Sequence, residues 1–144
     1  MEWKNWVSWG AIGRLVVLVG PLVAAHALFA EPATVGRSTS WGSFYVAYTS
    51  SPSPIPLGEL FGLTVTVSDS ADHSKGLGDS TIAVEALMPT HHHGMNLHPR
   101  VTAIGDGRFA VDGMLFHMPG PWQILIDVTR DGVTERAVFD VAVE

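Results

Sequence analysis

Residues 122–143 have the sequence WQILIDVTRDGVTERAVFDVAV, and this stretch decides the fold. Its apolar residues alternate with polar ones on both sides of Asp131-Gly132, a pair typical of a tight turn between two strands. In a strand, every second side chain lies on the same face. The stretch therefore predicts a hairpin with one buried face, formed by Trp122, Ile124, Ile126, Val128, Ala137, Phe139, Val141 and Val143.

Five further apolar runs precede this hairpin, and none has the spacing of an amphipathic helix. Segments rich in Gly, Pro, Asp and Ser separate the runs, as expected for turns. Seven short strands at intervals of about ten residues are typical of a β-sandwich. We therefore expect an all-β domain with strands near Phe44–Tyr48, Leu60–Val67, Ile82–Leu87, Val101–Ile104, Phe109–Phe116, Trp122–Thr129 and Ala137–Val143.

The first 30 of the 144 residues have the pattern of a targeting segment. Lys4 and Arg14 precede the apolar run LVVLVGPLVAA at residues 15–25, and the small-residue pattern Ala25-His26-Ala27 follows. This order predicts a secretory signal peptide in residues 1–30, with an uncleaved membrane anchor as the alternative. In both cases we expect a periplasmic or other extracytoplasmic location. Residues 31–42 are small and polar and predict a linker, so residues 43–144 form the single domain.

Composition and charge exclude several classes of function. The chain has 8 Lys and Arg against 14 Asp and Glu, a formal net charge of −6, which disfavours nucleic acid and anionic lipid as partners. It has no cysteine, which excludes disulfides, iron–sulfur clusters, thiol nucleophiles and a blue-copper centre. Neither GxSxG nor HExxH nor a phosphate-binding glycine loop is present, so we expect no enzyme activity.

One segment departs from the ordinary strand pattern. MPTHHHGMNLHP at residues 88–99 holds four of the seven His and two of the five Met, and a His-Met pair follows the strand predicted at 109–116. Imidazole suits copper, zinc and nickel, whereas thioether sulfur favours copper, Cu(I) above all. In an extended backbone, residues two apart project to the same side. The segment predicts a site for Cu(I) or Cu(II) with His91, His93 and Met95 as core ligands, completed from His98, His117 and Met118.

Other interpretations of the same residues stay open. The histidines are solvated loop residues if the chain is a structural or assembly-accessory module that binds a membrane or periplasmic protein through a sheet edge or loop. Neighbouring imidazoles also gain charge between about pH 7 and 5, which is the basis of a pH switch. Cleavage after Ala25 would expose His26 as an N-terminal copper chelate.

Residues 54–143 resemble the YtkA-like and FixH-like exported domains through MPTHHHGM at 88–95, GDGRFAVDGMLFHMPGPW at 105–122 and the closing hairpin. The resemblance implies an immunoglobulin-like β-sandwich on the outer face of the cytoplasmic membrane, without enzyme activity. It implies a role next to copper handling or respiratory-oxidase assembly. By position in the motifs, the residues that it implies as functional are Met88, His91, His93, Met95, His117 and Met118.

Overall fold

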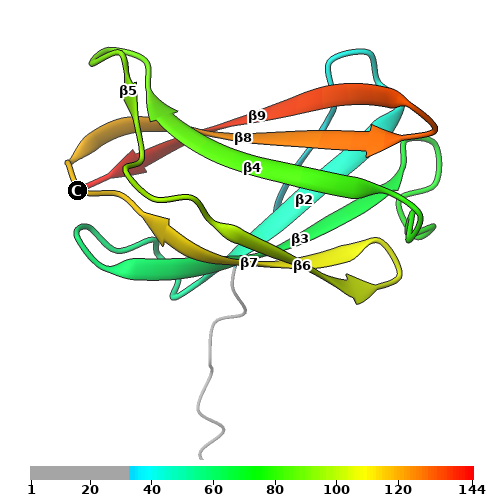
Figure 1. The fold of residues 1–144 in the computed structure, drawn as a ribbon, viewed down its shortest axis with the longest axis horizontal. Coiled ribbons are helices and arrows are strands. Elements are labelled where there is room, and N and C mark those ends of the chain that lie inside the picture. The colour runs from blue at the N-terminus through cyan, green and yellow to red at the C-terminus, as the bar shows by residue number, and fades with distance from the viewer. Residues whose placement is uncertain (1–32) are drawn as a thin grey trace, which may run out of the picture.

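The chain folds into two antiparallel sheets packed face to face, in a computed structural model that describes residues 33–144 (Figure 1). The first sheet has the strand order β1-β2-β3-β7-β6, and the second has the order β5-β4-β8-β9. The strands are β1 (Val35–Ser38), β2 (Phe44–Ser51), β3 (Leu60–Asp69), β4 (Thr81–Met88), β5 (His93–Gly94), β6 (Arg100–Gly105), β7 (Arg108–Leu115), β8 (Gly120–Arg130) and β9 (Val133–Val143).

The strand order is that of an immunoglobulin-like sandwich. In that fold the first, second, fifth and fourth strands form one sheet, and the third, sixth and seventh form the other. Strands β2-β3-β7-β6 and β4-β8-β9 reproduce both sets in the same order along the chain. Each of the seven predicted strands is present, so the all-β sandwich is confirmed.

Two short strands raise the number to nine, and no alternating pattern marks either of them. Strand β1 lies within the stretch predicted as a linker, and all four of its residues are exposed. It forms because its backbone pairs with the edge of β2, from Val35 opposite Tyr48 to Ser38 opposite Tyr45. Strand β5 consists of two residues of the His-rich segment, paired with the end of β4. Backbone pairing at a sheet edge needs no apolar side chains, which is why both escaped the prediction.

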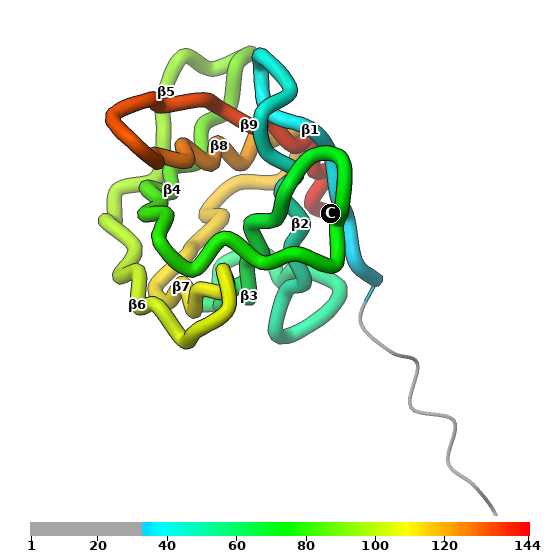
Figure 2. Tube along the Cα trace, turned by 90° about the vertical axis from the view of Figure 1, so that its right-hand side faces the viewer, coloured from blue at the N-terminus to red at the C-terminus, as the bar shows by residue number. Residues whose placement is uncertain are grey.

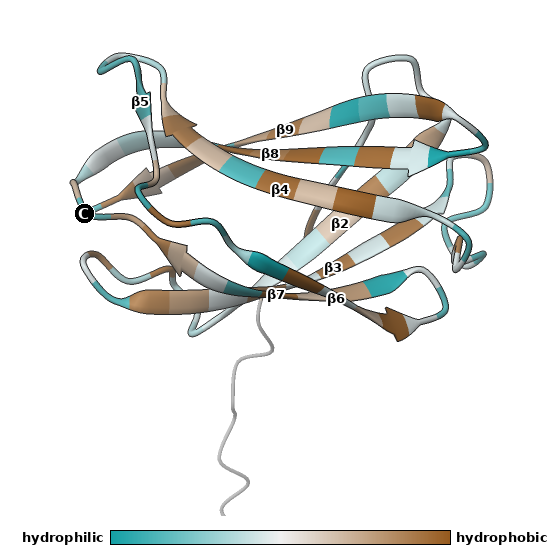
Figure 3. Cartoon of the chain, viewed as in Figure 1, coloured by the Kyte–Doolittle hydropathy of each residue, from teal (hydrophilic) through white to brown (hydrophobic). Residues whose placement is uncertain are grey.

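The predicted hairpin supplies one wall of the core. Trp122 pairs with Val141 and Ile124 with Phe139, and alternate residues of β8 and β9 face inward. Figure 3 shows the corresponding alternation of apolar and polar residues along β8. All eight predicted core residues are buried except Val141, which is partly buried and packs against the others. Leu125 lies on the opposite face of β8 and is buried as well, because β8 is an inner strand with β4 and β9 on its two sides.

Figure 2 views the two layers after a quarter turn and shows that β4 and β6 lie on the same side of the sandwich, in different sheets. Strand β4 precedes the His-rich segment and β6 follows it, so the segment crosses from one sheet to the other. The predicted signal peptide or anchor in residues 1–30 lies outside the described residues. Within residues 33–144, no helix is long and apolar enough to cross a membrane.

Candidate metal centre

The two His- and Met-containing segments lie at the same end of the sandwich, which we call the His/Met end and define by residues 88–99 and 116–119. The first segment begins with a tight turn, in which the backbone carbonyl of Met88 accepts hydrogen bonds from the N–H groups of His91 and His92 at 3.1 and 3.0 Å. His92 has a φ of 54°, in the left-handed region. The extended backbone expected for residues 91–95 is therefore present only from His93 onward, in β5.

His93 has two imidazole neighbours at this end. The ring centre of His93 lies 5.8 Å from that of His91 and 5.3 Å from that of His117. Two imidazoles that coordinate one ion through nitrogen at about 2.0 Å have ring centres about 5 to 6 Å apart. Both separations fall in that range, and they join residues from two loops that are distant in sequence. His93 is thus the centre of the cluster.

The imidazole nitrogens are little used by the protein itself. His93 Nδ1 lies 3.3 Å from the carbonyl oxygen of Gly94, a long contact. The side chains of His91, His92, His98 and His117 form no hydrogen bond to another residue of the described part of the chain. His91 and His117 are exposed and His93 is half-buried. Their ring nitrogens are therefore accessible to a ligand from solvent.

The thioethers lie on the inner side of the cluster. Met95 Sδ accepts a hydrogen bond from the N–H of Leu115 at 3.5 Å, and the side chain packs against the core. Met118 is partly buried and also packs against the core. Met88 is fully buried, as expected for a methionine that fills the core at a strand end. Met95 and Met118 are thus the two partly buried thioethers of the His/Met end.

His98 takes a different position. It is exposed and lines a groove together with His93, but it shares no ring contact with the other histidines of residues 33–144. In that part of the chain, no three His, Cys, Asp or Glu side chains are grouped closely enough to hold a metal ion by themselves. A complete ligand shell at the His/Met end therefore needs a thioether, a solvent molecule or a rearranged side chain beside two imidazoles.

Trp122 lies against the cluster, and the sequence pattern indicated only its role in the core. The indole centre is 5.5 Å from the ring centre of His117 and 6.1 Å from that of His93, with interplanar angles of 76° and 73°. On the protein side, Phe116 stacks nearly parallel to the indole with a centre separation of 4.6 Å. His117 and Trp122 are close in sequence, but Pro119-Gly120-Pro121 between them is a pattern typical of a turn and does not indicate how the two side chains are oriented.

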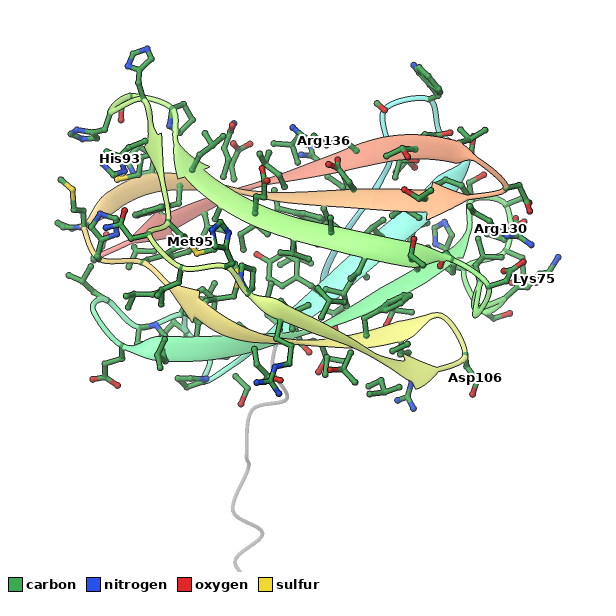
Figure 4. All side chains as sticks on the ribbon, viewed as in Figure 1. Lys75, His93, Met95, Asp106, Arg130 and Arg136 are labelled. Carbon is green, nitrogen blue, oxygen red and sulfur yellow. The ribbon has the colours of Figure 1, made fainter. Side chains whose placement is uncertain are left out.

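A groove of about 840 Å³ continues from this end along β4. His93 and Met95 line this groove, and Figure 4 shows both side chains at this end of the sandwich. Met95 donates its N–H to Ala86 O, so the backbone groups of Ala86 point away from β8. Backbone groups alternate sides along a strand, and those of Val84 and Ile82 therefore face the same open edge. The apolar side chains that line the groove include Ile82, Val84, Ala86, Met88, Met95, Leu97 and Val101.

Comparison with known proteins adds no relative: no family model, no curated protein and no solved structure matches the chain. The similarity to YtkA-like and FixH-like domains therefore stays a prediction.

Proposed function

We propose that this chain is an exported, non-enzymatic copper-handling protein that binds one copper ion at its His/Met end. The observation that supports the proposal is the pair formed by His93 and His117, which two separate loops bring to a ring separation of 5.3 Å. This separation suits two nitrogen ligands of a single ion. His91 is the third imidazole, and Met95 and Met118 are the thioethers of the same two segments.

The donor types favour copper over other ions. Imidazole is a suitable ligand for zinc, nickel and copper and does not distinguish among them by donor type. Thioether sulfur is a soft donor that selects copper. Apart from the 3.3 Å contact of His93 Nδ1 with Gly94 O, the imidazoles form no internal hydrogen bond in residues 33–144, so an ion displaces mainly water from them. Met95 Sδ exchanges its contact with the Leu115 N–H for the ion. The role is handling rather than catalysis: the protein binds copper outside the cytoplasm and passes it to, or receives it from, a membrane or periplasmic protein.

The test is metal binding by the purified full chain and by a paired variant. We expect the parent to bind one equivalent of copper against a competing chelator, tested separately with Cu(I) and Cu(II). His93→Ala combined with His117→Ala removes both nitrogen ligands, and we expect the affinity to fall by more than about 100-fold, since even outer partners of ligands contribute about 10- to 100-fold. Failure of the parent to bind copper would overturn the proposal.

The same loop offers a matched control. His92→Asn combined with His98→Asn also removes two histidines, from residues that share no ring contact with the cluster in the described part of the chain. Asparagine tolerates the left-handed backbone at residue 92 better than alanine does. We expect this control to keep the parent's copper affinity within about threefold, a change below 1 kcal/mol. If both double variants lost copper affinity equally, the number of histidines and not a defined site would account for binding.

The open edge of β4 favours a second candidate function, an interaction module that accepts an extended segment of another protein. Strand addition to a free edge uses backbone hydrogen bonds for affinity and side-chain pockets for specificity. The backbone groups of Ile82 and Val84 face such an edge beside an apolar groove. This candidate predicts a membrane or periplasmic partner that crosslinks to the parent and is lost in Ile82→Pro, which removes an edge N–H. It also predicts that copper leaves the stability of the protein unchanged.

A further inference from the structure

Three rings form a triangle at the His/Met end. Its sides are 5.3 Å between His93 and His117, 5.5 Å between His117 and Trp122, and 6.1 Å between His93 and Trp122. The midpoint of the shortest side is about 5 Å from the indole centre, and an ion bound by nitrogen lies off that midpoint, about 3 Å from each imidazole centre. An ion on the side of that line that faces the indole is therefore inside the ~6 Å range of a cation–π contact.

The indole is held rigidly in this position. Its Nε1–H donates to the backbone carbonyl of Met118 at 2.9 Å, and Phe116 stacks on it at an interplanar angle of 13°. Both imidazoles stand nearly perpendicular to it, and only 1% of Trp122 is exposed. The hydrogen bond to Met118 also ties the second His/Met loop to the ring. The aromatic surface is thus preorganised next to the ligands.

We propose that Trp122 determines the metal specificity of the site, with its indole lying against the bound ion and favouring Cu(I) over divalent ions. This inference rests on the proposed function. An apolar aromatic surface offers a cation its π electrons but none of the hard oxygen donors that a divalent ion needs to replace water. The cost of removing an ion from water rises steeply with its charge, so a monovalent soft ion loses least. The neighbouring thioethers of Met95 and Met118 act in the same direction.

The first experiment uses indole emission. The chain has five tryptophans, and changing Trp3, Trp6, Trp9 and Trp41 to Phe leaves Trp122 as the sole emitter in the full chain. Trp41 is 77% exposed, so its replacement disturbs no core packing. We expect Ag(I), a redox-inert substitute for Cu(I), to change the emission of Trp122 and to saturate at one equivalent. Zn(II) serves as the closed-shell divalent control, and Cu(II) is left out because a paramagnetic ion quenches without contact.

The second experiment compares Trp122→Phe with Phe116→Leu. Trp122→Phe weakens the aromatic surface and removes the bond to Met118, and we expect Cu(I) affinity to fall about tenfold while Zn(II) affinity changes less than about threefold. Phe116→Leu removes the ring that stacks on the indole and leaves Trp122 and the imidazoles unchanged. We expect it to leave the ratio of Cu(I) to Zn(II) affinity unchanged. Urea unfolding verifies that each variant is folded.

The outcomes separate this inference from the proposed function. Unchanged Trp122 emission on saturation with Ag(I), or equal loss of Cu(I) and Zn(II) affinity in Trp122→Phe, would overturn the role of the indole. Copper binding that still depends on His93 and His117 would in that case leave the proposed function intact. Absence of binding in the parent chain would overturn both. A Cu(I)-selective loss together with a saturating emission change supports the inference.

Discussion

The two ends of the sandwich are both rich in polar side chains, and they use them in opposite ways. At the end opposite the His/Met end, which we call the carboxylate end (residues 39–43, 69–79, 105–107 and 130–135), carboxylates bind groups of the protein itself. Asp79 pairs with Arg130 at 2.8 Å, and Asp69 accepts the N–H groups of Ala71 and Asp72. Figure 4 shows Lys75, Asp106 and Arg130 gathered there, far from His93 and Met95.

Glu135 is the clearest example of internal use. It is only 2% exposed, and its Oε2 accepts hydrogen bonds from the Thr39 hydroxyl and from the N–H groups of Trp41 and Ser43. These bonds fix the turn between β1 and β2 against the start of β9. At the His/Met end, by contrast, the imidazoles form almost no internal hydrogen bond within residues 33–144. Polar groups at the carboxylate end therefore stabilise the fold, whereas the imidazoles at the His/Met end are available to a ligand.

The largest expected effect concerns the close packing of the carboxylate end. Gly107 has a φ of 70°, and a Cβ at this position would collide with the backbone atoms Leu77 N and Val67 O. Backbone atoms cannot move aside cheaply, so we expect Gly107→Ala to lower the free energy of unfolding by about 3 kcal/mol. Gly105→Ala is the control, because Gly105 also has a positive φ but its Cβ would meet open space, and backbone strain alone costs about 1 kcal/mol. Urea unfolding measures both, and equal losses would contradict the steric explanation.

Removal of the buried carboxylate should have an effect of similar or slightly smaller size. Glu135→Ala leaves two backbone N–H groups, those of Trp41 and Ser43, without their acceptor. Hydrogen bonds to a charged group contribute about 1.5 to 3 kcal/mol each, and water replaces part of this, so we expect a loss of about 2 to 3 kcal/mol. Copper affinity should stay at the parent value, since the change lies at the far end. A parallel loss of copper binding would show that the two ends are not independent.

The pH dependence of stability measures how far the carboxylate end holds the fold. Burial tends to raise the pKa of Glu135, but the hydrogen bonds from Ser43, Thr39 and Trp41 outweigh it and hold the pKa below the ordinary value of 4.5. The carboxyl group of Glu135 therefore binds a proton more readily in the unfolded chain than in the folded one. The stability that the ionised carboxylate contributes is present above about pH 4.5 and is lost as the pH falls through the folded-state pKa. Hydrogen bonds also lower the pKa values of Asp69, Asp72 and Asp79, so their contributions have the same sign.

We expect the free energy of unfolding of the parent to fall as the pH is lowered below 4.5, with a smaller fall in Glu135→Ala. Urea titrations at several pH values give this difference directly. The parent and the variant share the three aspartates, so the difference between them isolates Glu135. If the free energy of unfolding falls equally with pH in both proteins, the hydrogen bonds to Glu135 do not stabilise its ionised form in the fold.

The fold was largely predictable because it depends on local repetition. Alternation on both sides of Asp131-Gly132 defines the closing hairpin, and the same period locates the five other strands. Strand β1 was not predictable, since VGRS carries no apolar pattern and forms by backbone pairing with β2. The polar, Gly-rich composition of segment 69–79 is typical of a surface loop, yet the segment packs on the fold: Leu77 enters the core and His73 stacks on Tyr45 with a centre separation of 3.6 Å.

The candidate site was predictable in its residues and much less in its geometry. Residue types indicated both His/Met segments, but spacing alone assumed an extended backbone through His91, where two hydrogen bonds to Met88 O instead close a turn. The approach of His93 to His117 depends on the strand order, because the two loops come from different strand pairs. The position of Trp122 beside them depends on the same long-range packing, which no local period encodes.

The smallest expected effect bears most directly on the comparison of the two ends. Without metal, His93→Ala combined with His117→Ala should lower the free energy of unfolding by less than about 1 kcal/mol, because these side chains form few internal contacts besides those with Trp122. With copper at 100 times its dissociation constant, the parent should gain about 2.7 kcal/mol and the variant almost nothing. Urea unfolding of both proteins with and without copper gives the four values. If the metal-free double variant lost as much free energy of unfolding as Glu135→Ala does, the imidazoles would stabilise the fold. The polar side chains at both ends of the sandwich would then have the same structural role.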